Sequence, residues 1–183
     1  MTSRLPRVEF DHAFYHITAR GNNRQNIFLE EKDFTRFLFE LVRVVREYDW
    51  RCYAYCLMTN HYHLTIQTIQ PNLSLGMRTL HMRYSKYFRE QHVFTGSLFE
   101  NRYDSSMISD DAYVLEAIRY DLINPVRANL VKHPEDWRWS SYAETAGFEK
   151  PSEWVDVAWV RSMFDDETLP AKRFIDFISM GIN

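Results

Sequence analysis

The sequence is poor in the residues that several protein classes require. Its 183 residues include only two cysteines, five glycines and six prolines, too few for a disulfide-rich, collagen-like or low-complexity chain. Cys52 and Cys56 stand four positions apart in a strand-like stretch, so they lie about 13 Å apart and cannot pair with each other. The longest run without a charged residue, 52–77, is interrupted by polar side chains, which excludes a membrane-spanning helix. Because the N-terminus also lacks an apolar signal sequence, we expect a reduced, cytoplasmic protein with no membrane partner.

The sequence also lacks the basic excess that would point directly to a nucleic-acid partner. Its formal net charge is -3, but residues 1–130 carry +1 and residues 131–183 carry -4. Arginine outnumbers lysine 17 to 5, and the guanidinium group matches phosphate oxygens well. Composition alone leaves two interpretations open, a phosphate-rich partner and an ordinary solvated surface.

Hydrophobic periodicity predicts a single α+β domain. Residues 13–20 read as a strand, residues 33–48 as an amphipathic helix with Asp33 as its N-cap, and residues 50–58 and 61–68 as a hairpin. A second helix follows Pro71, a short strand covers 103–108, and a third helix runs from about 110 to 124, where Pro125 disfavours its continuation. This order predicts a ferredoxin-like split βαβ fold, an antiparallel sheet with helices on one face plus an additional helix. A last helix is expected over 171–180.

The triplet His61-Tyr62-His63 is the sharpest local pattern. Because side chains alternate across a strand, the two histidines share one face and Tyr62 takes the other. Two imidazoles at this spacing can bind one metal ion, but they can equally be hydrogen-bonded or surface histidines. No cysteine or third histidine stands nearby in the sequence to complete a structural zinc site.

The third helix supplies a candidate nucleophile. Tyr120 and Asn124 are four positions apart and share a helical face, so a phenol and an amide oxygen can face one ion. The competing interpretation is that Tyr120 is a core or interface residue. His16, in the middle of the first strand, is expected to be a hydrogen-bonded sheet residue.

Several longer stretches resemble one family. HYH resembles the histidine signature of the HUH single-tyrosine transposases, and RYDLINPVRANLV resembles the tyrosine-bearing helix of their REP-associated branch. Further matches are FYHITARGNNRQNIF, YSKYFREQHVFTGSLFENRY and WRWSSY, so the resemblance spans about residues 13–142. It implies a metal-dependent single-strand DNA endonuclease and strand transferase with a 5′-phosphotyrosine intermediate.

The resemblance also assigns residues to roles. It implies Tyr120 as the nucleophile, His61, His63 and Asn124 as metal ligands, and Mg²⁺ or Mn²⁺ as the ion, because phosphate and amide oxygens are hard ligands and imidazoles favour Mn²⁺. Single-stranded or hairpin DNA is the expected partner. The candidate DNA contacts are basic or amide side chains: Arg20, Asn22, Asn23, Arg24, Arg78, Arg83, Lys86, Arg102 and Arg127.

Three rival functions remain at this point. One is a relaxase-like or replication-initiator-like HUH nuclease, another is a single-stranded nucleic-acid binding module without catalysis, and the third is a histidine-metal hydrolase of small molecules. We expect residues 1–143 to form the transposase domain and residues 144–183 to be an extension packed on it. A monomer is favoured over a homodimer, because the short connection at 108–111 restrains the tyrosine helix.

Overall fold

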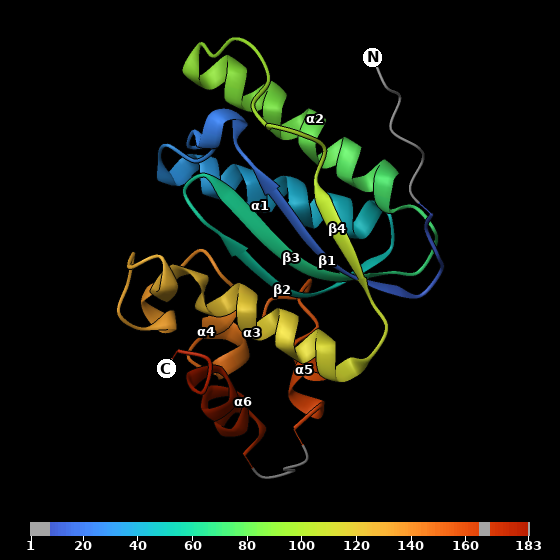
Figure 1. Ribbon diagram of the computed structural model, residues 1–183, viewed down its shortest axis with the longest axis vertical. Helices are drawn as coiled ribbons and strands as arrows, with labels where there is room; N and C mark the ends of the chain where they lie inside the picture. Colours follow the sequence, from blue (N-terminus) through green and yellow to red (C-terminus); the bar gives the residue numbers. More distant parts are fainter. Residues whose placement is uncertain (1–7, 165–168, 183) are drawn as a thin grey trace.

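The computed structural model describes residues 8–164 and 169–182 (Figure 1). Four strands, β1 (Ala13–Arg20), β2 (Trp50–Leu57), β3 (His61–Thr68) and β4 (Asp104–Ile108), form one sheet. The helix α1 (Glu31–Glu47) connects β1 to β2, and α2 (Leu73–His92) connects β3 to β4. After β4 come α3 (Asp111–Arg127), α4 (Tyr142–Ala146), α5 (Val157–Ser162) and α6 (Pro170–Ser179), with short 3-10 turns η1 (Asn22–Arg24) and η2 (Pro134–Asp136).

The sheet has the strand order β2-β3-β1-β4, and all neighbouring strands are antiparallel. Helices α1 and α2 cover one face, while α3 and the later helices lie on the other (Figure 1). This confirms the predicted ferredoxin-like arrangement and places the additional helix on the face opposite α1 and α2. The site described below lies between the sheet and α3.

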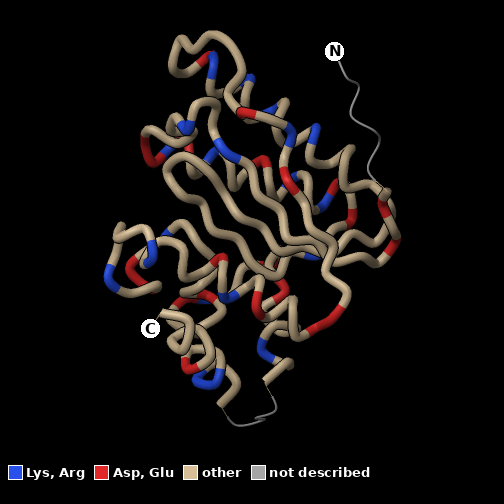
Figure 2. The backbone as a smooth tube through the Cα atoms, in the orientation of Figure 1, with Lys and Arg blue, Asp and Glu red and all other residues tan. Residues whose placement is uncertain are grey.

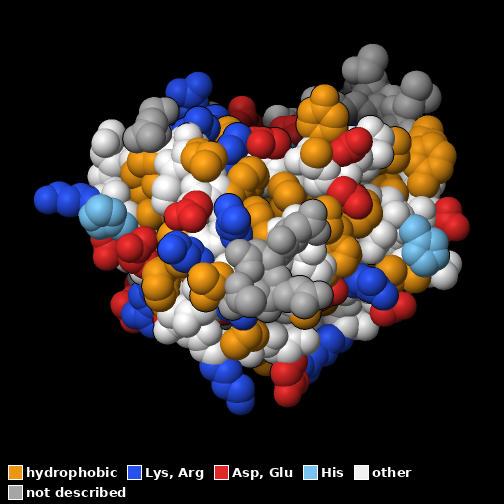
Figure 3. Space-filling view, turned by 90° about the horizontal axis from the view of Figure 1, so that it is seen from below, with side chains coloured by type: hydrophobic (Ala, Val, Ile, Leu, Met, Phe, Trp, Pro, Cys, Tyr) orange, Lys and Arg blue, Asp and Glu red, His pale blue; other side chains and the backbone are white. Residues whose placement is uncertain are grey.

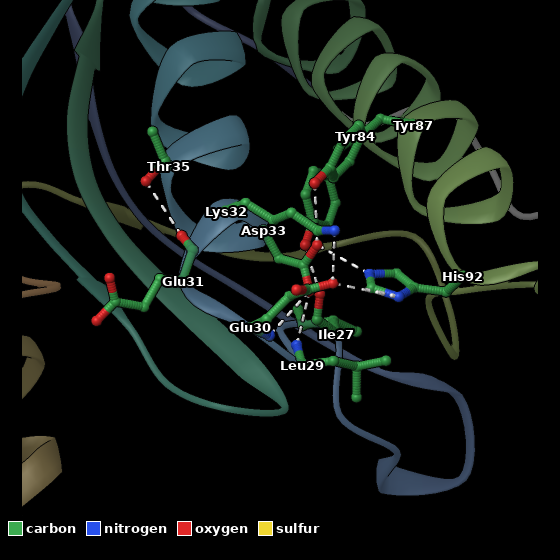
Figure 4. Close-up of polar contacts among 10 residues, drawn as sticks. All are labelled: Ile27, Leu29, Glu30, Glu31, Lys32, Asp33, Thr35, Tyr84, Tyr87 and His92. Atoms are coloured by element: carbon green, nitrogen blue, oxygen red, sulfur yellow. Dashed lines mark hydrogen bonds and ion pairs between the residues drawn. The ribbon is translucent and has the colours of Figure 1, made fainter.

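The start of α1 is held by a buried carboxylate (Figure 4). Asp33 is fully buried, and its Oδ2 accepts hydrogen bonds from the backbone N–H groups of Leu29 and Glu30, at 2.8 and 3.1 Å. Its Oδ1 accepts from the Tyr87 hydroxyl at 3.1 Å and lies 2.9 Å from Nε2 of His92. The prediction that Asp33 is the N-cap was wrong, because Glu30 is the N-cap and Asp33 closes a capping box three residues later.

The prediction that the third helix stops at Asn124 was also wrong. Helix α3 continues through Pro125 to Arg127, and the N–H of Ala128 still donates to the carbonyl of Asn124 at 2.9 Å. Proline removes one backbone donor. Since Pro125 stands in the last turn, that loss shortens the hydrogen-bond ladder without breaking the helix.

The C-terminal helices form a second core with α3. Phe174 and Ile178 of α6 are fully buried in one cluster with Ile118 and Leu122 of α3. Helix α6 therefore packs on α3, and the predicted division after residue 143 would fall inside α4. Cys52 and Cys56 are free and buried. Within the described ranges no helix combines the length and apolar character needed to cross a bilayer. Residues 1–7, on which the expected absence of a signal sequence partly rests, lie outside those ranges.

Candidate active site

The two histidines of the HYH triplet lie on one face of β3. Their ring centroids are 5.0 Å apart, whereas Tyr62 turns to the opposite face, where its ring packs 4.7 Å from that of Phe37 of α1. The alternation predicted from the sequence is therefore present. His61 is partly exposed, and His63 is buried, with 5% of its surface exposed.

A neighbouring amide orients the imidazole of His61. Its Nδ1 lies 2.7 Å from Oδ1 of Asn60, while Nδ2 of Asn60 donates to the carbonyl of Arg24 at 3.0 Å. Because the Asn60 oxygen can only accept, Nδ1 of His61 carries the proton and Nε2 keeps a free lone pair. Burial, together with the charges of His63 and Arg20, lowers the pKa of His61 to about 4. His61 is therefore neutral at pH 7, as a metal ligand must be.

His63 faces a buried carboxylate on α3. Its Nδ1 lies 3.5 Å from Oδ1 of Asp121, and within the described part of the chain neither ring nitrogen has a hydrogen-bond partner. Burial lowers the pKa of His63, and His16 and Arg20 lower it further against the opposing effect of Asp121. Buried polar atoms without partners are rare in folded proteins. These nitrogens therefore have the character of ligand atoms.

Asp121 of α3 contacts three strand residues, which are His63, His16 and Thr65. It is fully buried, with His16 Nε2 2.8 Å from Oδ1 and the Thr65 hydroxyl donating to Oδ2 at 2.8 Å. Burial acts to lower the pKa of His16, but the hydrogen bond and charge of Asp121 outweigh it, so the pKa is raised. Ligand atoms of His16, His63 and Asp121 lie within 4.8 Å of one another, so the group can hold a metal ion.

Sequence reasoning missed Asp121 and assigned His16 only to the sheet. The His16 side chain is hydrogen-bonded, as expected, but its partner is the Asp121 carboxylate of α3 and not another residue of the sheet. A usable signal was present, because Asp121 falls at helical spacing from Val114, Ile118 and Pro125 on the apolar side of α3, and a carboxylate on a buried side needs a partner.

Tyr120 stands at the rim of this group. Its ring centroid is 5.7 Å from that of His63 and 5.9 Å from that of His16, and 45% of its surface is exposed. The guanidinium of Arg127 lies 5.6 Å from the Tyr120 ring. Asn124 lies one turn further along α3, and its Nδ2 donates to the Tyr120 carbonyl at 2.9 Å. The phenol, two histidines and a guanidinium thus meet at one accessible place.

The predicted DNA contacts fall in three places. Arg20 pairs with His61 in the register of β1 and β3, and Asn22, Asn23 and Arg24 form the adjacent turn η1. Arg127 is beside Tyr120. The others belong to α2 and the segment after it, on the opposite face of the sheet, and basic residues along α2 are visible in Figure 2. Of these, Arg83 is paired with Glu47 at 2.8 Å and Lys86 with Glu90 at 4.0 Å, whereas Arg78 and Arg102 line a cavity.

Comparison with solved structures shows which fold this is. The structure of a REP-associated tyrosine transposase bound to a REP hairpin matches with a TM-score of 0.68 and 18% sequence identity, covering 86% of this chain and 91% of the other. A Deinococcus radiodurans R1 protein, provisionally described as a transposase, matches with a TM-score of 0.45 and 14% identity, covering 75% of this chain and 97% of the other. No curated protein sequence matches this chain.

The family comparison rests on sequence. Residues 9–120 match the profile of the family described as "Transposase IS200 like". The match covers more than half of the chain and includes the HYH triplet and Tyr120. It confirms the resemblance to the single-tyrosine transposases, and the fold agrees with that of a REP-associated member. The chain belongs to the IS200-like transposase family.

Proposed function

We propose that this transposase nicks and rejoins single-stranded or hairpin DNA through a covalent 5′-phosphotyrosine at Tyr120. One observation carries the proposal. A half-exposed phenol lies with its ring 5.7 Å from that of a buried histidine that has no hydrogen-bond partner in the described part of the chain. This pairing supports a nucleophile beside a metal ligand in a chain of this family.

A divalent cation fits the residues that are present. His61 offers a free Nε2 and His63 has two buried nitrogens without hydrogen bonds, so both are suited to hold Mg²⁺ or Mn²⁺. Two residues are candidates for an oxygen ligand. Asn124 donates its amide nitrogen to the Tyr120 carbonyl and keeps its side-chain oxygen as an acceptor, and Asp121 lies in one group with His63. When bound, such a cation neutralises charge on the phosphate that reacts.

The protein's own residues account for the remaining chemistry. The Tyr120 oxygen attacks the phosphorus and loses its proton, the bond from phosphorus to the 3′ oxygen breaks, and that oxygen takes up a proton. Arg127 lies beside the Tyr120 ring, where its guanidinium can pair with a phosphate oxygen. Because the phosphotyrosine conserves the energy of the broken bond, a 3′-hydroxyl can displace Tyr120 and rejoin strands without ATP.

Hairpin DNA is the proposed substrate. The structural relative is described as bound to a REP hairpin, and the arginines of the β1 end and η1 of this chain lie next to His61.

The reduced thiols of Cys52 and Cys56 and a DNA substrate favour a cytoplasmic site of action. We propose that the site is complete in one monomer, because His16 and His63 contact α3 of the same chain.

Replacing Tyr120 by phenylalanine tests the proposal. The Tyr120→Phe protein should bind hairpin DNA like the wild type, but form no denaturation-resistant DNA adduct and release no cleaved strand, since only the attacking oxygen is lost. Tyr113→Phe is the matched control, because Tyr113 is an exposed tyrosine of the same helix, and it should form the adduct normally. An adduct on Tyr120→Phe would refute the assignment of the nucleophile. A wild type that never forms an adduct would instead indicate a binding module.

A further inference from the structure

The carboxylate that holds the start of α1 belongs to a second group of metal-ligating side chains. Asp33 of α1, Glu30 directly before that helix and His92 in the last turn of α2 each offer one ligand atom, and these atoms lie within 4.8 Å of one another. Figure 4 shows the His92 ring pointing from α2 toward both carboxylates. Because α1 and α2 cover the face of the sheet opposite α3, this group is separate from the site at Tyr120.

The geometry of the group suits one ion. Nε2 of His92 lies 2.9 Å from Oδ1 of Asp33, and Nδ1 of the same ring lies 3.8 Å from Oε1 of Glu30. Ligand atoms around one zinc ion are about 3–3.5 Å apart, because each bond to the ion measures about 2.0–2.2 Å. Asp33 is buried, whereas Glu30 is exposed. A movement of the Glu30 side chain is therefore enough to bring the ligand atoms to these separations.

The hydrogen bonds of Asp33 orient its carboxylate as a ligand. Its Oδ2 accepts from the backbone N–H groups of Leu29 and Glu30, which leaves Oδ1 directed at His92. Outer hydrogen bonds of this kind fix metal-ligating carboxylates in proteins. An ion between Oδ1 and the ring replaces only the hydrogen bond to His92, and the bonds to the two backbone groups and to the Tyr87 hydroxyl stay in place.

A cation is already held at this group. Nζ of Lys32 lies 3.0 Å from Oε1 of Glu30, the oxygen that also faces His92. The next basic residue of α1, Arg36, is paired instead with the buried Glu40 at 2.7 Å. Within the group, two carboxylates therefore face one ammonium, and that ammonium belongs to an exposed side chain that an ion can displace. By contrast, acidic and basic side chains are interspersed on the face shown in Figure 3.

We propose that Glu30, Asp33 and His92 form a second metal site, which binds Zn²⁺. One imidazole with two carboxylates is a ligand set that suits this ion, and water completes the coordination on the exposed side. The ion would join the end of α2 to the segment before α1. In that segment the N–H groups of Ile27 and Phe28 donate to the carbonyl of Thr59, at 3.0 and 3.1 Å, in the turn that precedes the HYH triplet. The role is structural and goes beyond the proposed function.

Zinc binding to the full-length protein tests the site. The protein is freed of metal with EDTA, and His61→Ala with His63→Ala removes the histidines of the candidate active site as competing ligands. Isothermal titration calorimetry should then find one Zn²⁺ per chain. Free Zn²⁺ at about 100 times the dissociation constant should raise the midpoint of thermal unfolding by about 5–10 °C. Absence of zinc binding in this protein would overturn the proposal.

Variants of the group, made in the same background, locate the ion. His92→Gln should lose the zinc-dependent shift in unfolding temperature. Glu30→Gln, which keeps an oxygen at an exposed position, should weaken Zn²⁺ binding at least about tenfold. Lys32→Ala should strengthen it by up to about fivefold, because the ion no longer displaces an exposed ion pair.

His133→Gln is the matched control, because His133 is an exposed histidine outside the group. It should bind Zn²⁺ with unchanged affinity. Unchanged affinity in both His92→Gln and Glu30→Gln would overturn the proposal, as would weaker binding in Lys32→Ala. The measurement needs no DNA, so its outcome is independent of whether Tyr120 forms an adduct.

Discussion

Nε2 of His16 lies 2.8 Å from Oδ1 of Asp121 although the two residues are 105 positions apart. This hydrogen bond ties β1 to α3 directly beside Tyr120, and the Thr65 hydroxyl holds the second carboxylate oxygen. The orientation of the tyrosine helix toward the sheet therefore depends on a buried polar group as well as on apolar packing.

This contact predicts an energetic coupling. His16→Ala and Asp121→Ala should each lower the free energy of unfolding, but the double variant should be more stable than additivity implies, by about 1–3 kcal/mol, because each single variant leaves a buried group without its partner. Urea denaturation measures the coupling. A cycle that pairs Asp121→Ala with His133→Ala, an exposed histidine, should be additive. Additive effects of His16 and Asp121 would contradict this role.

The proposed metal site predicts that cleavage depends on His61. His61→Ala should lose at least about 100-fold in divalent-dependent cleavage, since even residues that only orient a metal ligand are worth about 10–100-fold. Because His61 is partly exposed, the thermal unfolding of the variant should remain close to that of the wild type. Cleavage of a labelled hairpin with and without Mn²⁺ measures the effect, and His133→Ala serves as the control. Wild-type cleavage in excess EDTA would rule out a metal role.

The β1 end and the adjacent turn predict a change in the salt dependence of binding. Arg20→Ala and Arg24→Ala should weaken hairpin binding, and each should reduce the log-log slope against salt by about 0.7–0.9, the value for one phosphate contact. Lys172→Ala removes an exposed charge on α6 and should leave the slope unchanged. The measurement is a binding titration at several ionic strengths. An unchanged slope in both arginine variants would place these residues on the ordinary solvated surface.

His81 predicts a loss of stability in acid. Its pKa is about 3 in the folded protein, against an ordinary value of 6.5. Between these values the unfolded chain binds a proton that the folded chain does not, so acidification through this window lowers the free energy of unfolding. His81→Gln should remove this part of the pH dependence. Urea denaturation at neutral and acidic pH measures it, with the exposed His133→Gln as the control. An identical loss in the wild type and in His81→Gln would contradict the prediction.

Local sequence pattern was sufficient to predict strands of the sheet and part of the candidate active site. The predicted strands 13–20 and 61–68 agree with β1 and β3, because short runs rich in aromatic and β-branched residues next to turn residues are a local signal of a strand. The alternation of side chains along a strand put His61 and His63 on one face. The helical spacing of Tyr120 and Asn124 likewise needed no information from elsewhere in the chain.

Only the tertiary structure decided which groups surround Tyr120. His16 and Asp121 meet because β1 lies beside β3 in the sheet and because α3 packs its apolar side, including Ile118 and Leu122, into the second core. Strand pairing and helix packing are long-range, so periodicity in β1 or in α3 alone does not reveal that the two segments touch. The continuation of α3 through Pro125 has the same origin, since burial of Leu122 and Ile123 stabilises a last turn that local propensity would end.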